Sequence, residues 1–195
     1  MSPVTPQQQQ ERLPPLPPER LTYAQRAVAD SIARGPRGAV YGPFVPLLRS
    51  PELADCAQRM GAYLRYRSAI GDRLTELAIL VIAREWNQAV EWAIHMPLAE
   101  QAGIARAAIV AIAHRRRPDG LDADETMVHD FCVELARDKG VSDATYARVH
   151  ARFGETGVVD LAGINGYYTL LAMVMNTART PMPPGATAAL APLPK

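Results

Sequence analysis

Apolar residues recur along most of the chain at intervals of three and four, the spacing of one face of an amphipathic α-helix. No segment alternates with a period of two for long enough to predict a β-sheet. Pro, Gly and capping residues divide the helical pattern into separate elements. We therefore predict an all-α body, with helices at about residues 19–33, 51–67, 73–86, 88–102, 105–113, 122–139, 142–153 and 156–177.

Two segments early in the chain carry distinct local signals. Residues 41–46, Tyr-Gly-Pro-Phe-Val-Pro, are too rich in Gly and Pro for a helix, so we expect an irregular segment there. Ser50 and Pro51 are typical of a helix start, with Ser as the N-cap and Pro at the first helical position.

Proline is concentrated at the two ends of the chain. Of 17 prolines, six fall in residues 1–18 and five in residues 181–195. Few helix breakers remain between these ends. We predict a Pro/Gln-rich N-terminal arm at 1–18, one all-α domain at 19–180 and a Pro/Ala-rich C-terminal tail at 181–195.

Charge and composition narrow the function classes. The 195 residues are 48% hydrophobic, which is enough for a core, and the formal net charge is +1. So balanced a chain has no bulk attraction to nucleic acid or to an anionic membrane, and we expect neither as a partner. No apolar run reaches the ~18–20 residues that span a bilayer. The Gln- and Pro-rich N-terminus is unlike a signal peptide, so we predict a cytoplasmic protein.

The two cysteines, Cys56 and Cys132, are far apart and form no CxxC pair. Neither a disulfide scaffold nor a cysteine zinc site fits this spacing. Both lie in apolar helical contexts, so we predict buried, reduced thiols.

Glu76 is a carboxylate in a helix that is otherwise apolar around nearly its whole circumference. Such a helix is expected to be buried, and a buried carboxylate has a raised pKa unless a cation or hydrogen-bond donors compensate. Glu76 is therefore a candidate site residue. The alternatives are a structural ion pair or a cap on a neighbouring helix.

Gln88, Glu91 and His95 are spaced i, i+3 and i+7, so they share one face of the following helix. Glu91 is four residues before His95, where it can orient the imidazole and raise its pKa, an arrangement suited to proton transfer near neutral pH. The alternative is an ordinary surface pair. Pro97 removes one backbone hydrogen bond from this helix and is expected to kink it.

Other polar residues are weaker candidates. Arg65 lies beside Tyr63 and is able to bind a ligand carboxylate, and Tyr167 places a hydroxyl in an apolar helix. A tyrosine in a helical core is more often structural, with its hydroxyl bonded to the backbone. His129 would need further inward-facing ligands to hold a metal, and we expect no metal site. Residues 115–117, three arginines, are expected to form a solvated turn.

Taken together, several segments resemble the carboxymuconolactone decarboxylase family, in the superfamily that includes the alkylhydroperoxidase D proteins. The central segments are Glu76 within residues 74–84, Glu-Trp-Ala-Ile-His at residues 91–95, Leu-Ala at 98–99 and Ala-Gly at 102–103. Residues 42–44, 50–54, 61–65, 141–145 and 166–168 are also similar to its larger members. The resemblance covers about residues 35–185.

The resemblance implies an alkylhydroperoxidase D-like helical bundle that assembles into trimers or hexamers, with active sites near subunit contacts. The peroxidase branch of the superfamily uses a Glu, a CxxC pair and a His four residues after the second Cys. By spacing, the Glu corresponds to Glu76 and the His to His95, and the two Cys positions fall on Gln88 and Glu91. Both thiols are absent, so the resemblance disfavours thiol peroxidase chemistry.

The decarboxylase branch needs no cysteine, and it implies a lyase of aromatic catabolism acting on a small carboxylated lactone. In this interpretation His95 is the proton donor, Glu91 orients it, and Glu76 is a second acid or a polar orienter. Arg65 anchors a substrate carboxylate. The predicted substrate-binding set is completed by Tyr63, Gln88, Trp92 and Tyr167. No metal or organic cofactor is implied, because the substrate carries its own electron sink.

Two alternatives stay open. The same Glu/Glu/His site fits a hydrolase-like or other acid–base enzyme acting on a different substrate. The chain is also compatible with a non-catalytic oligomeric binding protein, because shared ancestry fixes the fold more firmly than the activity.

Overall fold

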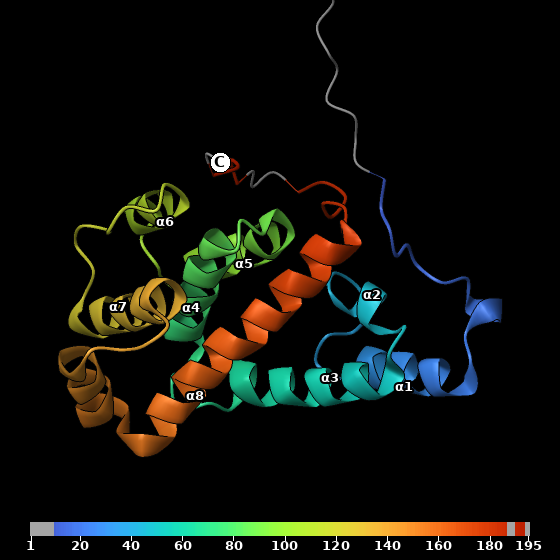
Figure 1. The fold of residues 1–195 in the computed structure, drawn as a ribbon, viewed down its shortest axis with the longest axis horizontal. Helices are drawn as coiled ribbons and strands as arrows, with labels where there is room; N and C mark the ends of the chain where they lie inside the picture. Colours follow the sequence, from blue (N-terminus) through green and yellow to red (C-terminus); the bar gives the residue numbers. More distant parts are fainter. Residues whose placement is uncertain (1–9, 187–189, 194–195) are drawn as a thin grey trace, which may run out of the picture.

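The computed structural model describes residues 10–186 and 190–193, and within these ranges the protein is all-α, without a β-strand (Figure 1). The elements are the 3-10 turn η1 Pro18–Arg20 and the helices α1 Tyr23–Arg34, α2 Phe44–Leu47, α3 Pro51–Tyr66, α4 Asp72–Glu85, α5 Ala89–Gln101, α6 Arg106–Ala113, α7 Ala123–Asp138 and α8 Asp143–Ala178. The predicted all-α fold class is confirmed.

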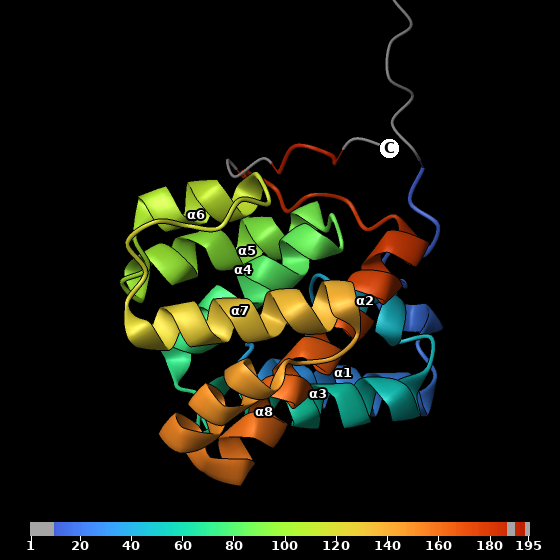
Figure 2. The same ribbon diagram turned by 60° about the vertical axis from the view of Figure 1, so that its left-hand side comes forward.

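Helix α4 forms the centre of the molecule. Residues 74–84 are buried without interruption, as expected for a helix that is apolar on all sides. It packs mainly against α5, α7 and α8. In Figure 1, α8 crosses the molecule diagonally, with α1–α3 on one side and α6 and α7 on the other. Figure 2 shows α7 and α6 beside the α4–α5 pair.

Helix α8 consists of two helical pieces joined at Gly154. This residue has φ 68° and ψ −174°, a conformation open essentially to glycine alone. The sequence predicted one helix ending at 153 and another beginning at 156, and this interruption lies between them. The break lets the first piece turn away from the long second piece that lines the core (Figure 1).

The segment around Pro43 differs from the prediction, because residues 44–47 form the short helix α2. Pro46 is compatible with it, since the first turn of a helix needs no intrahelical N–H donors. Phe44, Pro46 and Leu47 are buried, so packing stabilises the turn. Ser50 precedes α3 as expected, but its side chain makes no capping hydrogen bond.

The described parts of both termini pack on the helices of their own chain. The backbone N–H of Arg12 donates to the carbonyl of Ala178 at 2.8 Å, and the Arg49 guanidinium donates to the carbonyl of Pro14. In the C-terminal segment Leu190 is buried in the core. Residues 1–9 of the predicted arm, and 187–189 and 194–195 of the predicted tail, lie outside the described residues.

Among the described residues, α8 alone is long and apolar enough to pass a length and hydropathy test for a membrane span. Half of its most apolar window is buried inside the protein, as in the core helices of globular domains. One such helix is weak support for a membrane span.

Candidate active site

The imidazole of His95 lies between two carboxylates. Its Nδ1 is 2.6 Å from Oε2 of Glu76, and its Nε2 is 3.1 Å from Oε1 of Glu91. All three residues are buried, with exposed fractions of 4%, 6% and 3% for His95, Glu76 and Glu91. Both ring nitrogens therefore have an anionic partner in a region that water hardly reaches.

Two neighbouring helices position these side chains. Glu76 lies in the middle of α4, while Glu91 and His95 lie one turn apart on α5. Only residues 86–88 separate the two helices, and a left-handed Asn87 (φ 51°) reverses the chain so that α5 packs along α4. The i,i+4 pair was predicted from sequence, whereas the contact between α4 and α5 arises from tertiary packing.

The carboxylates control the charge of the imidazole. Burial lowers the pKa of His95, but the hydrogen bonds to Glu76 and Glu91, together with their charges, outweigh burial, so the pKa is raised above its ordinary value. The imidazolium form donates to both carboxylates at once. The two carboxylates therefore favour the charged form of His95, which is the form that can donate a proton.

Arg65 joins the same cluster from α3. Its Nη2 is 3.3 Å from Oε1 of Glu76, and its side chain is 14% exposed. Burial opposes the charge of Arg65, but nearby Tyr168 and Glu76 raise its pKa overall. Oε2 of Glu91 is buried and has no hydrogen-bond partner among the described residues. The cluster thus contains two basic side chains, Arg65 and His95, and two carboxylates. One carboxylate oxygen, Oε2 of Glu91, is free to accept a proton or a hydrogen bond.

Two tyrosines of α8 form an aromatic wall beside this cluster. Tyr168 makes an edge contact with His95, with ring centroids 5.4 Å apart, and another with Tyr167 at 5.1 Å. Burial raises the pKa of Tyr167 to about 12 and that of Tyr168 well above 10, so both stay protonated at neutral pH. Tyr168 was missing from the predicted site, although Tyr-Tyr in an apolar helix was a usable signal.

Tyr167 belongs to the wall but has a partner that the sequence did not indicate. Its hydroxyl accepts a hydrogen bond from Nη2 of Arg37 at 3.1 Å, not from the backbone. A Cβ at Gly61 would lie 2.2 Å from that hydroxyl, so this position of α3 requires glycine. Gly61 therefore allows Tyr167 to approach the backbone of α3.

Three predicted substrate-binding residues make contacts that the sequence did not indicate. The hydroxyl of Tyr63 donates to Asp160 at 2.9 Å, and Tyr63 is not part of the histidine cluster. Gln88 caps α5, because its amide oxygen accepts from the N–H of Val90, while its amide nitrogen donates to Asn176. Trp92 lies in the hydrophobic core. Tyr63 and Gln88 each contact a residue far away along the chain, and the substrate-binding role of all three residues stays a prediction.

The remaining histidines and the cysteines lie outside this cluster. His114 and His150 are exposed, as predicted, and His129 is buried on α7. No group of three His, Cys, Asp or Glu residues in the described chain is arranged to hold a metal. Cys56 is exposed, contrary to the prediction, whereas Cys132 is buried with its pKa raised by burial to about 12, and is therefore unreactive.

An apolar hollow of about 250 Å³ is lined in part by helix α5, which carries Glu91 and His95. It is lined by residues 40–42 and 45, by Val90 and Ile94 of α5, by residues 180–184, and by Glu11 and Pro15. Val90 and Ile94 directly precede the two α5 site residues, and Tyr41 lies close enough to Arg65 to influence its charge. The hollow and the site therefore share helix α5, and none of the four cluster residues lines the hollow.

Comparison with known proteins places the fold. No protein-family profile and no curated protein matches the sequence. Among solved structures, the alkylhydroperoxidase AhpD core from Ralstonia eutropha matches with a TM-score of 0.72 at 15% identity, covering 94% of this chain and 98% of that chain. A peroxidase-related protein from Silicibacter sp. matches with a TM-score of 0.70 at 15% identity, covering 92% and 94%.

A third structure in this group is an enzyme with a bound organic molecule. The debrominase Bmp8, as a Cys-to-Ala variant in complex with 2,3,4-tribromopyrrole, matches with a TM-score of 0.69 at 11% identity, covering 90% of this chain and 94% of that chain. At these identities the likeness establishes an alkylhydroperoxidase D-like fold, as the sequence predicted, and leaves the chemistry to the site itself.

Proposed function

We propose that this chain is a cofactor-independent acid–base enzyme of the carboxymuconolactone decarboxylase type, acting on a small carboxylated lactone or a related metabolite. The observation that carries the proposal is the buried His95 imidazole between Glu76 and Glu91. A debrominase among proteins of the same fold supports an enzymatic role.

In the proposed reaction the substrate loses CO₂ from a carbon conjugated, through an alkene, to the lactone carbonyl. The C–C bond to the carboxylate breaks, and its electron pair moves through the alkene to the carbonyl oxygen. The His95 imidazolium then donates a proton to carbon, and the carbonyl re-forms. One proton is consumed for each CO₂ released. Glu76 and Glu91 hold the imidazole in place and stabilise its charged form, which is restored after each turnover by a proton from solvent.

Arg65 and the apolar hollow have complementary roles in this proposal. A cation touching the departing carboxylate would stabilise the ground state more than the transition state, which slows the reaction. Arg65 therefore fits a carboxylate that the product keeps. The carboxylate that leaves as CO₂ fits against the apolar walls around Val90 and Ile94. There the charge localised on this carboxylate is less favourable than the charge that is dispersed over the substrate in the transition state.

The test is turnover of a panel of unsaturated carboxylated lactones, monitored by CO₂ release and by deuterium uptake at carbon from heavy water. We expect His95→Gln and Glu91→Gln to lower kcat by about 10²-fold or more, the range typical of a positioned acid or base. His114→Gln, an exposed histidine at the end of α6, and Glu100→Gln, late in α5, are the matched controls and retain activity.

Other outcomes of this assay support the alternative functions. Formation of a ring-opened acid without release of CO₂ would indicate that the same residues catalyse hydrolysis. Binding of lactones without turnover assigns the chain to a binding protein. Turnover that survives both His95→Gln and Glu91→Gln contradicts the proposed site.

A further inference from the structure

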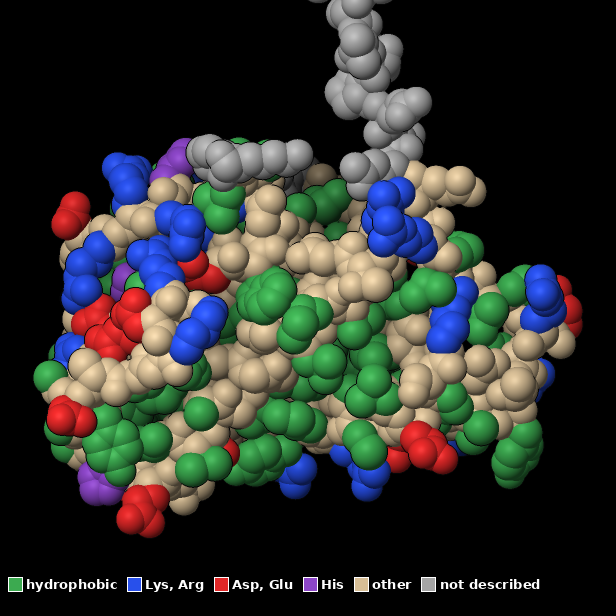
Figure 3. Space-filling model, viewed as in Figure 1, with side chains coloured by type: hydrophobic (Ala, Val, Ile, Leu, Met, Phe, Trp, Pro, Cys, Tyr) green, Lys and Arg blue, Asp and Glu red, His purple; other side chains and the backbone are tan. Residues whose placement is uncertain are grey.

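A second hollow of about 250 Å³ lies where α4, α6 and α7 meet, and it shares no lining residue with the histidine cluster. Five arginines line it, namely Arg84, Arg115, Arg116, Arg117 and Arg137. Figure 3 shows basic, acidic and histidine side chains gathered over this end of the molecule. Three carboxylates also line the hollow, so its lining has a formal excess of two positive charges when His129 is neutral.

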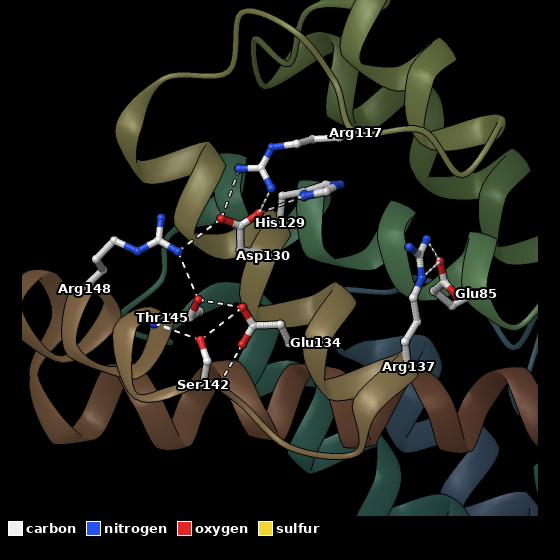
Figure 4. Close-up of polar contacts among 9 residues, drawn as sticks. All are labelled: Glu85, Arg117, His129, Asp130, Glu134, Arg137, Ser142, Thr145 and Arg148. Atoms are coloured by element: carbon white, nitrogen blue, oxygen red, sulfur yellow. Dashed lines mark hydrogen bonds and ion pairs between the residues drawn. The ribbon is translucent and has the colours of Figure 1, made fainter.

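The carboxylates are already engaged. Glu85 pairs with Arg115 at 2.5 Å and with Arg137 at 2.6 Å. Asp130 receives Arg117 from one side and Arg148 from the other. Figure 4 shows the contacts of Asp130 with Arg117 and Arg148. It also shows that Glu134 points toward Ser142 and Thr145 at the start of α8.

Glu134 forms no ion pair with any of the five arginines, although its charge counts in the excess of two. Its carboxylate accepts from the backbone of Ser142 at 2.7 Å and from the hydroxyl of Thr145 at 2.7 Å. Each paired arginine still has N–H donors in excess of those its carboxylate uses, because a guanidinium has five. The hollow therefore keeps unused donors as well as unbalanced charge.

Arg84 is the most unusual of the five. Its residue is only 2% exposed, it has no carboxylate partner, and its Nε has no hydrogen-bond partner among the described residues. Its guanidinium donates only to neutral oxygens, at Ala113, Ala191 and Asn87. A buried cation without an anion is costly, and burial, followed by the nearby Arg115 charge, lowers the pKa of Arg84.

Arg116 is the fifth arginine in the lining of the hollow. It is exposed and forms no ion pair with any described residue. Val81, Ile112 and Val133 give the same hollow an apolar wall. A ligand that satisfies this lining carries two negative charges at one end and an apolar group at the other.

We propose that this hollow binds a phosphate monoester with a small apolar body. Arginine forks match the geometry of phosphate oxygens, and a dianion cancels the excess charge around Arg84 and Arg116. The site lies toward the end of α4, eight residues after Glu76, or about 12 Å along the helix axis. It is therefore a binding site additional to the proposed active site.

The test is isothermal titration calorimetry, in which phenyl phosphate, inorganic phosphate, malonate or phenol is titrated into the full chain. We expect phenyl phosphate to bind with a Kd of about 1 mM or tighter, inorganic phosphate more weakly, and phenol not at all. Arg116→Gln should weaken phenyl phosphate binding about tenfold, because one charge-assisted hydrogen bond is lost. Arg106→Gln, an exposed arginine on α6 outside the hollow, is the control and binds like the unmodified chain.

Three results would overturn the proposal. The first is no heat of binding with phenyl phosphate, and the second is equal weakening by Arg106→Gln and Arg116→Gln, which indicates non-specific attraction. The third is malonate binding as tightly as phenyl phosphate, which removes the preference for phosphate. Thermal melting of both variants verifies that they are folded.

Discussion

At the scale of single residues, the charge on His95 is the property on which the proposed chemistry depends. A histidine buried alone would be neutral, because burial disfavours the charged form. Here two carboxylates reverse that preference, and Arg65 balances the second negative charge. The result is a cluster that is neutral overall yet contains a proton in position to move.

The raised pKa of His95 predicts how stability depends on pH. The unfolded chain binds this proton with a pKa of about 6.5, and the folded chain binds it more tightly. The folded state therefore holds more protons between the two pKa values, so the stabilisation is complete below about pH 6.5 and is lost as the pH rises through the folded-state pKa. We expect His95→Gln to destabilise the protein by about 3 kcal/mol at pH 6, because two buried carboxylates lose their counter-charge, and by less at pH 9.

Urea unfolding at the two pH values measures this difference. His114→Gln is the control, since this exposed histidine should leave the pH dependence of the unmodified chain intact. A destabilisation by His95→Gln that is equal at both pH values would contradict a charged His95.

The sequence predicted the residues of this cluster better than their contacts. Glu91 and His95 were paired correctly, because helical spacing places residues four apart together. The contact between Glu76 and His95 depends on how α5 folds back along α4, and a periodicity carries no information on that. The hydrogen bond of Tyr63 was not predicted for a related reason, since its partner Asp160 lies on α8.

At the scale of elements, the helix boundaries followed the sequence closely because Pro, Gly and capping residues act locally. The predicted helix at 73–86 corresponds to α4 Asp72–Glu85, and that at 122–139 to α7 Ala123–Asp138. Asp122 and Glu125 form a reciprocal capping box at the start of α7. α2 was missed, because burial of Phe44 and Leu47 stabilises a turn whose Gly and Pro content argues against a helix.

The break in α8 predicts that replacing Gly154 by alanine lowers the stability of the protein more than the same replacement at Gly140. Gly154 has a backbone conformation that is strained for any residue with a side chain, so Gly154→Ala should destabilise the protein by about 2 kcal/mol. Gly140→Ala is the matched control, because Gly140 has no positive φ and a Cβ there meets no atom within 4 Å. Its stability should be unchanged or slightly higher.

The measurement is chemical unfolding of both variants under identical conditions. Equal stabilities for Gly154→Ala and Gly140→Ala would show that α8 continues through residue 154 as a regular helix. The activity of Gly154→Ala should persist where the variant is folded, since the break lies far along α8 from Tyr168.

At the scale of the whole molecule, one face of α8 remains unpartnered within the chain. Val159 is 69% exposed and Met173 42%, and Ala162 and Gly166 lie exposed between them on the same side of the helix. We call these four residues the α8 stripe. Trp86 and a shallow hollow of about 180 Å³ adjoin it. In Figure 3 hydrophobic side chains extend across the middle of the molecule, where α8 and α3 lie.

This α8 stripe is where we expect the predicted homo-oligomer to form. An apolar helical face with small residues at its centre lets a second helix approach closely, and burying it removes the exposed apolar area from water. Gly166 faces open space, so a side chain there meets nothing within its own chain. We therefore expect Gly166→Arg to leave the folded chain intact, and even to favour the helix, while placing a charge in the middle of the subunit contact.

Light scattering after size-exclusion chromatography distinguishes these states directly. The unmodified chain should elute as a trimer or hexamer, and Gly166→Arg as a smaller species with an unchanged helical circular dichroism spectrum. Gly140→Arg, which places the same charge on an exposed turn away from the stripe, should retain the assembly. If the active sites lie near subunit contacts, as the family resemblance implies, Gly166→Arg should also lose turnover while His95 keeps its raised pKa. A monomeric unmodified chain, or an assembly that Gly166→Arg leaves intact, would assign this face to another partner.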